Sequence, residues 1–163
     1  MKKVFAFALL AVVGIYVTGQ LTLGEAGAMH FVREMDSLMN DGKAEDVCAM
    51  LHDDLEMHIE DHTSEVARNL DGGKDELCEL THDAVNALKS LPRTMRVEFN
   101  DVTVKRDWLH PWTSEVSYTE DRILTIRGTS IRISTTSEDV ITLVQTFSGV
   151  KLRKLKAETY VNE

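Results

Sequence analysis

The sequence predicts an α+β domain in which three N-terminal helices pack on a curled antiparallel sheet. Two patterns indicate this class. Apolar residues recur mainly at helical spacing before Pro92, and beyond Pro92 they alternate with polar residues at the spacing of β-strands. Because proline cannot continue a helix, Pro92 marks the change from one pattern to the other. Helices and sheet are therefore largely segregated along the chain.

The part of the chain before Pro92 is expected to hold the helices. The spacing of apolar residues predicts them over residues 28–39, 44–51 and about 74–91. Gly42 ends the first helix, because glycine adopts the left-handed conformation at a helix C-terminus at little cost. The period falls to two across residues 55–60, which indicates one half-buried strand between the second and third helices.

The residues after Pro92 are expected to form the sheet. Alternating apolar and polar residues predict strands over residues 95–104, 112–118, 122–134, 139–147 and 150–161. The phase of the alternation shifts at Asn100 and Asp101, and one extra residue at such a shift is typical of a β-bulge. Ser148 and Gly149 predict a hairpin turn between the last two strands.

An export signal is predicted at the N-terminus. Two lysines precede an apolar run from Val4 to Val17, and small residues then offer cleavage after Gly19 or after Ala28. We therefore expect a signal peptide over 1–28, a single domain over 29–163, and a periplasmic or secreted location. The alternative is an uncleaved membrane anchor, since about 20 residues from Val4 onward are long enough to span a bilayer.

Composition fits one packed domain and disfavours nucleic acid as a partner. The chain has 163 residues, 43% of them hydrophobic, with only two prolines, so a packed core is expected. A net charge of −9 repels phosphate backbones. The sequence contains no phosphate-binding glycine loop, serine-nucleophile motif or cofactor fingerprint, so we expect no cofactor.

Cys48 and Cys78 are the two cysteines, and both lie in predicted helices. An even number of cysteines in an exported chain predicts a disulfide. The bridge would close a loop of about 31 residues and contribute roughly 3.7 kcal/mol on the chain-entropy estimate. The alternative is that both are buried thiols that pack as small apolar groups.

Three segments, 39–46, 51–57 and 73–77, together with the order of the elements, resemble a known superfamily. Over about residues 28–161 the chain resembles the cystatin-like cone fold of nuclear transport factor two, ketosteroid isomerase and the SnoaL-like polyketide cyclases. The resemblance implies a cone-shaped α+β domain, and homodimers through the outer face of the sheet. It implies no single activity, because this fold hosts enzymes, binding modules and adaptors alike.

In the enzymes of this fold the resemblance implies a general base near the end of the first strand, facing the cone. Period-two alternation places Asp61 on one face with three apolar residues, Leu55, Met57 and Ile59. A carboxylate at the mouth of an apolar cavity has a raised pKa, and Asp61 is therefore the candidate base, with Tyr118 as candidate oxyanion donor. If the strand ends before Asp61, this residue instead faces water with an ordinary pKa.

Two tryptophans in the loop before the second strand of the sheet complete a predicted apolar pocket. Such loops often rim the open end of the cone, where aromatic side chains could clamp a ligand. Tryptophan is also enriched at interfaces, so the same pair could face a protein partner or cap the core. The predicted pocket residues are Leu55, Met57, Ile59, Trp108 and Trp112.

One charged face of the first strand allows a metal site as a weaker alternative. His58, Glu60 and His62 are two residues apart and share this face, so they could ligate zinc. An edge strand is, however, commonly kept charged to prevent mispairing, and this general explanation is preferred. No metal is therefore expected.

Three functions remain open. Catalytic groups are sparse, which favours an exported module that binds a small apolar ligand or a protein partner without turnover. The first alternative is an isomerase or lyase that uses Asp61 as its general base. The second is a membrane-anchored envelope assembly component, which requires the N-terminal segment to stay uncleaved. A homodimer is expected, and a membrane contact only in that last case.

Overall fold

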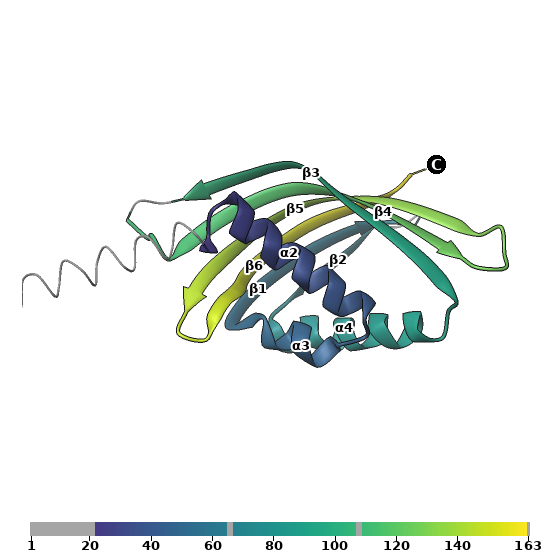
Figure 1. Cartoon of the computed structure of the whole chain (residues 1–163), viewed down its shortest axis with the longest axis horizontal. Coiled ribbons are helices and arrows are strands. Elements are labelled where there is room, and N and C mark those ends of the chain that lie inside the picture. The colour runs from purple at the N-terminus through teal and green to yellow at the C-terminus, as the bar shows by residue number, and fades with distance from the viewer. Residues whose placement is uncertain (1–21, 65–66, 107–108, 163) are drawn as a thin grey trace, which may run out of the picture.

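A computed structural model describes residues 22–64, 67–106 and 109–162 of the chain (Figure 1). The helices are α2 (Glu25–Asn40), α3 (Ala44–Ala49) and α4 (Lys74–Lys89). The strands are β1 (Leu51–His62), β2 (Arg68–Gly72), β3 (Arg93–Arg106), β4 (Thr113–Ile126), β5 (Arg132–Thr146) and β6 (Gly149–Val161). Most of the expected signal segment, residues 1–21, lies outside the described residues. Of the helices in these ranges, none has the length and apolar character needed to cross a membrane.

The six strands form one sheet in the order β2-β1-β6-β5-β4-β3. The α+β class is thus confirmed, but the expected arrangement holds only in part. β1 pairs parallel with β6, so the sheet is mixed and not purely antiparallel. α3 has only six residues, and α4 follows two strands where one was expected. β1 thus lies between β2, the next strand in sequence, and β6, the last strand of the chain.

The helices cover the concave face of the curved sheet (Figure 1). α2 forms because its apolar residues recur at helical spacing, and it buries Phe31 and Val32 against the sheet. α2 ends where Gly42 adopts φ +79°, which lets its amide donate to the Met39 carbonyl. α4 begins after Gly73, whose amide donates to the Glu76 carboxylate at 2.8 Å.

The two faces of the sheet differ sharply in polarity. On β5, Ile141 is 1% exposed on the inner face, whereas its neighbour Val140 is 37% exposed on the outer face. Charged side chains dominate the outer face between β1 and β6, where Lys154 pairs with Glu56 at 2.6 Å. The core therefore lies on the helix-covered side. The outer face offers mostly charged and polar groups to any partner.

The β-bulge predicted at Asn100 and Asp101 is confirmed. The register of β3 against β4 shifts between Asn100 and Thr103, and Asp101 has a φ of 52°. A bulge of this kind bends its strand, which fits the strong curvature of β3 over α2 in Figure 1. The predicted hairpin turn is also present, with Gly149 at φ +116° between β5 and β6.

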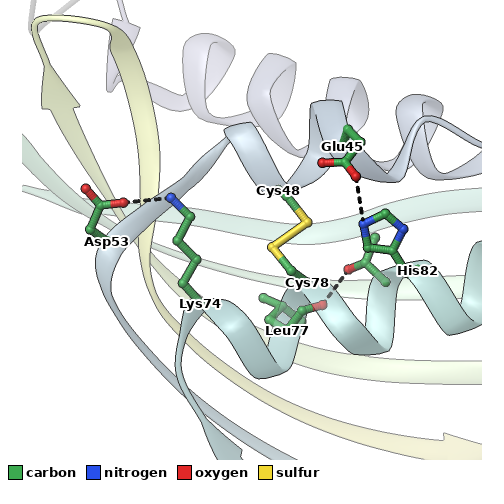
Figure 2. Close-up of a disulfide and its surroundings, with 8 residues drawn as sticks. Glu45, Cys48, Asp53, Lys74, Leu77, Cys78 and His82 are labelled. Carbon is green, nitrogen blue, oxygen red and sulfur yellow. Dashed lines mark hydrogen bonds and ion pairs between the residues drawn. A yellow bond between two sulfur atoms is a disulfide. The ribbon is translucent and has the colours of Figure 1, made fainter.

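Cys48 of α3 and Cys78 of α4 form the predicted disulfide, with Cα atoms 5.4 Å apart (Figure 2). This distance lies within the range that a disulfide spans without backbone movement. Ion pairs lie on either side of the bridge: Lys74 contacts Asp53 at 2.6 Å, and His82 contacts Glu45 at 3.3 Å. The bridge and these pairs tie α4 to the segment that runs from α3 into β1.

Candidate functional site

A cavity of about 350 Å³ lies between the concave face of the sheet and the helices. Most of the cavity wall is apolar, because the surrounding helices and strands line the cavity with the apolar residues of their inner faces. The apolar lining comes from both sides: Met35, Met39, Val47, Leu77, Leu80 and Ala84 from the helices, and Leu51, Ile59, Leu155 and Ala157 from the sheet. The disulfide cysteines neighbour Val47 and Leu77 in sequence, so the bridge holds part of this wall in place.

A strip of polar side chains crosses the sheet side of the cavity. Three of them, Tyr118, Glu120 and Arg122, are two residues apart on β4 and so share one face. β5 pairs with β4 so that Asp139 lies opposite Tyr118 and Ser137 lies opposite Glu120. The strip therefore follows from strand period and register, which bring two sets of inward polar residues side by side.

Asp139 and Tyr118 form the most deeply buried part of this strip. Asp139 is 8% exposed, and its Oδ1 accepts a hydrogen bond from the Ser137 hydroxyl at 2.6 Å. Burial raises the pKa of Asp139, and hydrogen bonds from Ser137 and Tyr118 oppose this only in part. Burial and the nearby Asp139 charge raise the pKa of Tyr118 well above its usual value. Both pKa shifts have burial as their largest cause.

Arg122 forms ion pairs with the carboxylates in the other half of the polar strip. Its Nη2 lies 2.6 Å from Glu120 Oε1 and 3.1 Å from Asp36 Oδ1 of α2, so one guanidinium joins sheet and helix. Burial raises the pKa of Glu120 and that of Asp36, while the charge of Arg122 opposes both shifts. With Asp139, one buried and two half-buried carboxyl groups lie near one cation. This end of the cavity is therefore acidic.

The structure separates the two predicted catalytic residues. Tyr118 lines the cavity, but Asp61 does not. Asp61 lies in β1 between Arg68 and Thr159, so the alternative that places it in a loop is wrong as well. Its Oδ1 accepts the Thr63 amide at 2.8 Å, and the hydrogen bonds with Thr63 lower its pKa. The raised pKa expected for a general base is thus absent at Asp61 and occurs at Asp139 instead.

Of the four predicted pocket residues that the structure describes, the cavity wall includes only Ile59. Leu55 and Met57 are buried, with Leu55 in the main core cluster. Trp112 is 47% exposed and precedes β4, at the opposite end of that strand from Arg122. Trp108 lies outside the described residues. The expectation that this loop rims the cavity is wrong for Trp112, because the cavity lies under the other half of the sheet.

The residues of the weaker metal alternative make other contacts. His58 Nδ1 lies 2.5 Å from Asp71, and its Nε2 lies 3.1 Å from Glu60. His62 stacks on Tyr160 with ring centroids 4.9 Å apart. Within the ranges that the structure describes, no group of three or more His, Cys, Asp and Glu side chains could hold a metal ion. The charged face of β1 is thus an ion-paired outer surface.

Sequence reasoning missed Asp139, Glu120, Arg122 and Asp36. A signal was available for Asp139, because it shares the period-two face of Ile141 and Leu143, both of which are buried. A carboxylate that is buried on such a face must be hydrogen-bonded or paired with a cation. The same reasoning applies to β4, where Val116 precedes Tyr118 on the inward face. Inward polar residues in two neighbouring strands would have indicated the site.

No family model matches this sequence, and no curated protein sequence matches it. The fold, in contrast, has clear relatives among solved structures. A candidate scytalone dehydratase from Novosphingobium aromaticivorans is similar with a TM-score of 0.65, 10% identity, and coverage of 90% of this chain and 92% of that chain. This chain has the cystatin-like cone fold.

Two further solved structures share the fold. An NTF2-like protein with a cystatin-like fold, also from N. aromaticivorans, has a TM-score of 0.61 and 15% identity, with 85% of this chain and 83% of that chain covered. A candidate dehydratase of the NTF2-like family from Streptomyces avermitilis has a TM-score of 0.59 and 13% identity, with 88% and 99% covered. The expected resemblance to the superfamily of nuclear transport factor two is thereby confirmed at the level of the fold.

Proposed function

We propose that the cavity binds a small, largely apolar molecule through one polar group, which Asp139 and Tyr118 recognise. The observation that carries this proposal is the burial of this hydrogen-bonded pair in a cavity whose remaining wall is mostly apolar. A pocket of this kind binds through its apolar wall and orients its ligand through a few polar groups. Because Asp139 accepts hydrogen bonds when ionised, a ligand hydroxyl or ammonium group suits it best.

The second candidate is proton-transfer catalysis at the same pair. Its support is the raised pKa of Asp139, which brings a carboxyl group closer to the pH at which a general base or acid is most effective. Two proteins of similar fold are described as candidate dehydratases. Dehydration is a reaction that uses proton transfer. Both candidate functions use Asp139 and Tyr118. An assay for turnover of the bound molecule is therefore needed to distinguish catalysis from binding.

The binding proposal predicts a specific affinity difference between 2-naphthol and naphthalene, measured by fluorescence titration. The hydroxyl group of 2-naphthol can reach Asp139, so we expect 2-naphthol to bind about tenfold more tightly, which is roughly 1.4 kcal/mol. Asp139→Leu should abolish this difference, because it removes the carboxylate that accepts the hydrogen bond of the hydroxyl group. Ala84→Trp fills the cavity and should weaken both probes. If Ala84→Trp changes neither affinity, the probes bind elsewhere and the proposed site is wrong.

Asp139→Asn is predicted to stabilise the fold at neutral pH. A carboxyl group with a raised folded-state pKa contributes stability below its unfolded pKa of about 3.9, and this contribution is lost as pH rises through the folded value. The amide of asparagine does not titrate, so the variant does not lose this stability as pH rises. The unfolding free energy of the variant should therefore exceed that of the unaltered protein at pH 7, and the gap should close near pH 4.

Urea denaturation at several pH values measures this gap. Asp53→Asn is the matched control, because Lys74 lowers the pKa of this exposed carboxyl group and so predicts a change of the opposite sign. A gap for Asp139→Asn that stays constant with pH would contradict the assigned cause.

We also propose that the protein is exported, and that any cleavage of its signal occurs after Gly19 and not after Ala28. Leu23 and Ala28 are fully buried in the core cluster, and α2 begins at Glu25. Cleavage after Ala28 would remove Leu23 and the first turn of α2. A chain that begins at Gln20 keeps both, so the first position is compatible with the folded domain.

Native mass spectrometry of the protein from its own envelope should find chains that begin at Gln20 or keep the whole N-terminal segment. We expect two copies per particle, since the charged outer face of the sheet carries both signs, for example Glu56 and Lys154. A mass that corresponds to a chain starting at Met29 would contradict the cleavage proposal. A monomer at micromolar concentration would contradict the homodimer.

A further inference from the structure

Three large apolar side chains are exposed at one end of the sheet. Phe147 is fully exposed in the turn between β5 and β6, while Leu109 and Trp112, before β4, are 57% and 47% exposed. These two connections lie side by side, because the Gln145 amide donates to the Trp112 carbonyl at 2.8 Å. We call Leu109, Trp112 and Phe147 the apolar rim. Such a group is costly to leave in water, so it indicates a contact surface.

The chain enters the domain at the apolar rim. The Thr22 hydroxyl donates to Gln145 Oε1 at 3.0 Å, and Gln145 also bonds the loop that carries Trp112. Figure 1 shows the start of α2, the β3–β4 connection and the β5–β6 hairpin at the same end of the sheet. The sequence just before Thr22 contains the apolar run from Val4 to Val17. The described part of the chain therefore begins next to the apolar rim, shortly after this apolar run in the sequence.

We propose that the uncleaved chain docks its apolar rim on the surface of a lipid bilayer. Aromatic side chains favour the membrane–water interface, and apolar loop tips can lie among the headgroups. Attraction to anionic lipids contributes little, because the chain carries a net charge of −9. The contact is thus apolar and insensitive to salt.

A second copy of the chain fits the apolar rim less well. Large side chains bury about 150–250 Å² each, so three of them give roughly 500 Å², below the ~800 Å² per partner of a stable interface. A lipid bilayer, in contrast, can bury these three side chains without a complementary protein surface.

This docking also leaves the cavity accessible. The cavity wall includes Thr135 and Thr159, which lie at the ends of β5 and β6 away from the apolar rim.

Quenching by nitroxide-labelled lipid tests the proposal on the full chain reconstituted in phosphatidylcholine vesicles. In a Trp108→Phe background Trp112 is the sole tryptophan. We expect nitroxides near the headgroups to quench its fluorescence at least twofold, with little change in high salt. The control chain combines Trp108→Phe, Trp112→Phe and Ile133→Trp, because Ile133 is also exposed but lies at the opposite end of β5. Its tryptophan should not be quenched.

Phe147→Asp should reduce the quenching of Trp112 by about half, and Phe147→Leu should restore it. Because Phe147 is fully exposed, both variants should keep the melting temperature of the parent. Equal quenching at Trp112 and at the control tryptophan would overturn the proposal. So would unquenched Trp112 together with disulfide-linked dimers of a Phe147→Cys chain, since a second copy would then cover the apolar rim.

Discussion

Replacement of Cys48 and Cys78 by serine is expected to lower the free energy of unfolding by about 3.7 kcal/mol. The disulfide joins residues 30 positions apart, and this figure is the conformational entropy contribution that the unfolded chain regains when the cross-link is removed. The melting temperature should fall by roughly 10–15 °C for a domain of this size. Urea and thermal denaturation of the oxidised protein and the double variant measure both quantities.

Treatment of the unaltered protein with reductant should reproduce the loss of stability, and reductant should leave the double-serine variant unchanged. Alkylation of the unreduced, unfolded protein should label neither cysteine. Two labels per chain, or a double variant as stable as the parent, would contradict the pairing.

The disulfide is also expected to matter for the cavity. Val47 and Leu77 line the cavity and directly neighbour the two cysteines, and Figure 2 shows the bridge joining α3 to the start of α4. Without the bridge, α4 is held by the packing of its buried face, which includes Val85, and the two pairs Lys74–Asp53 and His82–Glu45 are largely exposed and contribute little. The double variant should therefore bind 2-naphthol more weakly, even under conditions where it remains folded.

Local signals in the sequence were sufficient for several elements of the fold. The bulge at Asn100 and the turn at Gly149 depend on a phase shift and a glycine, which a few neighbouring residues reveal. β2 could not be predicted, because four of its five residues are exposed and it has no apolar alternation. The parallel pairing of β1 with β6 joins residues about a hundred positions apart, and local periodicity carries no information about it.

The candidate site was harder to predict than the fold. Strand period alone correctly placed Asp61 on the face of Ile59, and the structure confirms that β1 extends through Asp61. The period-two alternation does not reveal which part of the inner face of the sheet lines a cavity, because this depends on how the helices pack on the sheet. The helices leave their cavity beneath Tyr118 and Asp139, so desolvation is the main influence on the pKa of Asp139, whereas hydrogen bonds with Thr63 outweigh it at Asp61.

Replacement of Arg122 by methionine is expected to destabilise the protein by about 2–3 kcal/mol at pH 7. Arg122 is the cation between Glu120 and Asp36, and its removal leaves two half-buried carboxylates without this counter-charge. Loss of one partner from a fully buried pair costs roughly 3–5 kcal/mol, and the 29% exposure of the Arg122 side chain reduces this. Arg96→Met is the matched control, because its pair with Glu98 is exposed and should contribute less than about 1 kcal/mol.

The pH dependence of the Arg122→Met variant identifies the cause of its instability. Burial already raises the pKa of Glu120 and of Asp36, and the loss of Arg122 raises both further. The folded variant therefore binds protons more tightly than the unfolded chain, and its deficit relative to the parent should shrink as pH falls toward about 4. A second change, Glu120→Gln, should restore part of the stability at pH 7 because it removes one unpaired charge. If the deficit is equal at pH 7 and pH 4.5, lost packing of the arginine side chain is responsible, and the acidic half of the polar strip does not depend on Arg122 for its charge balance.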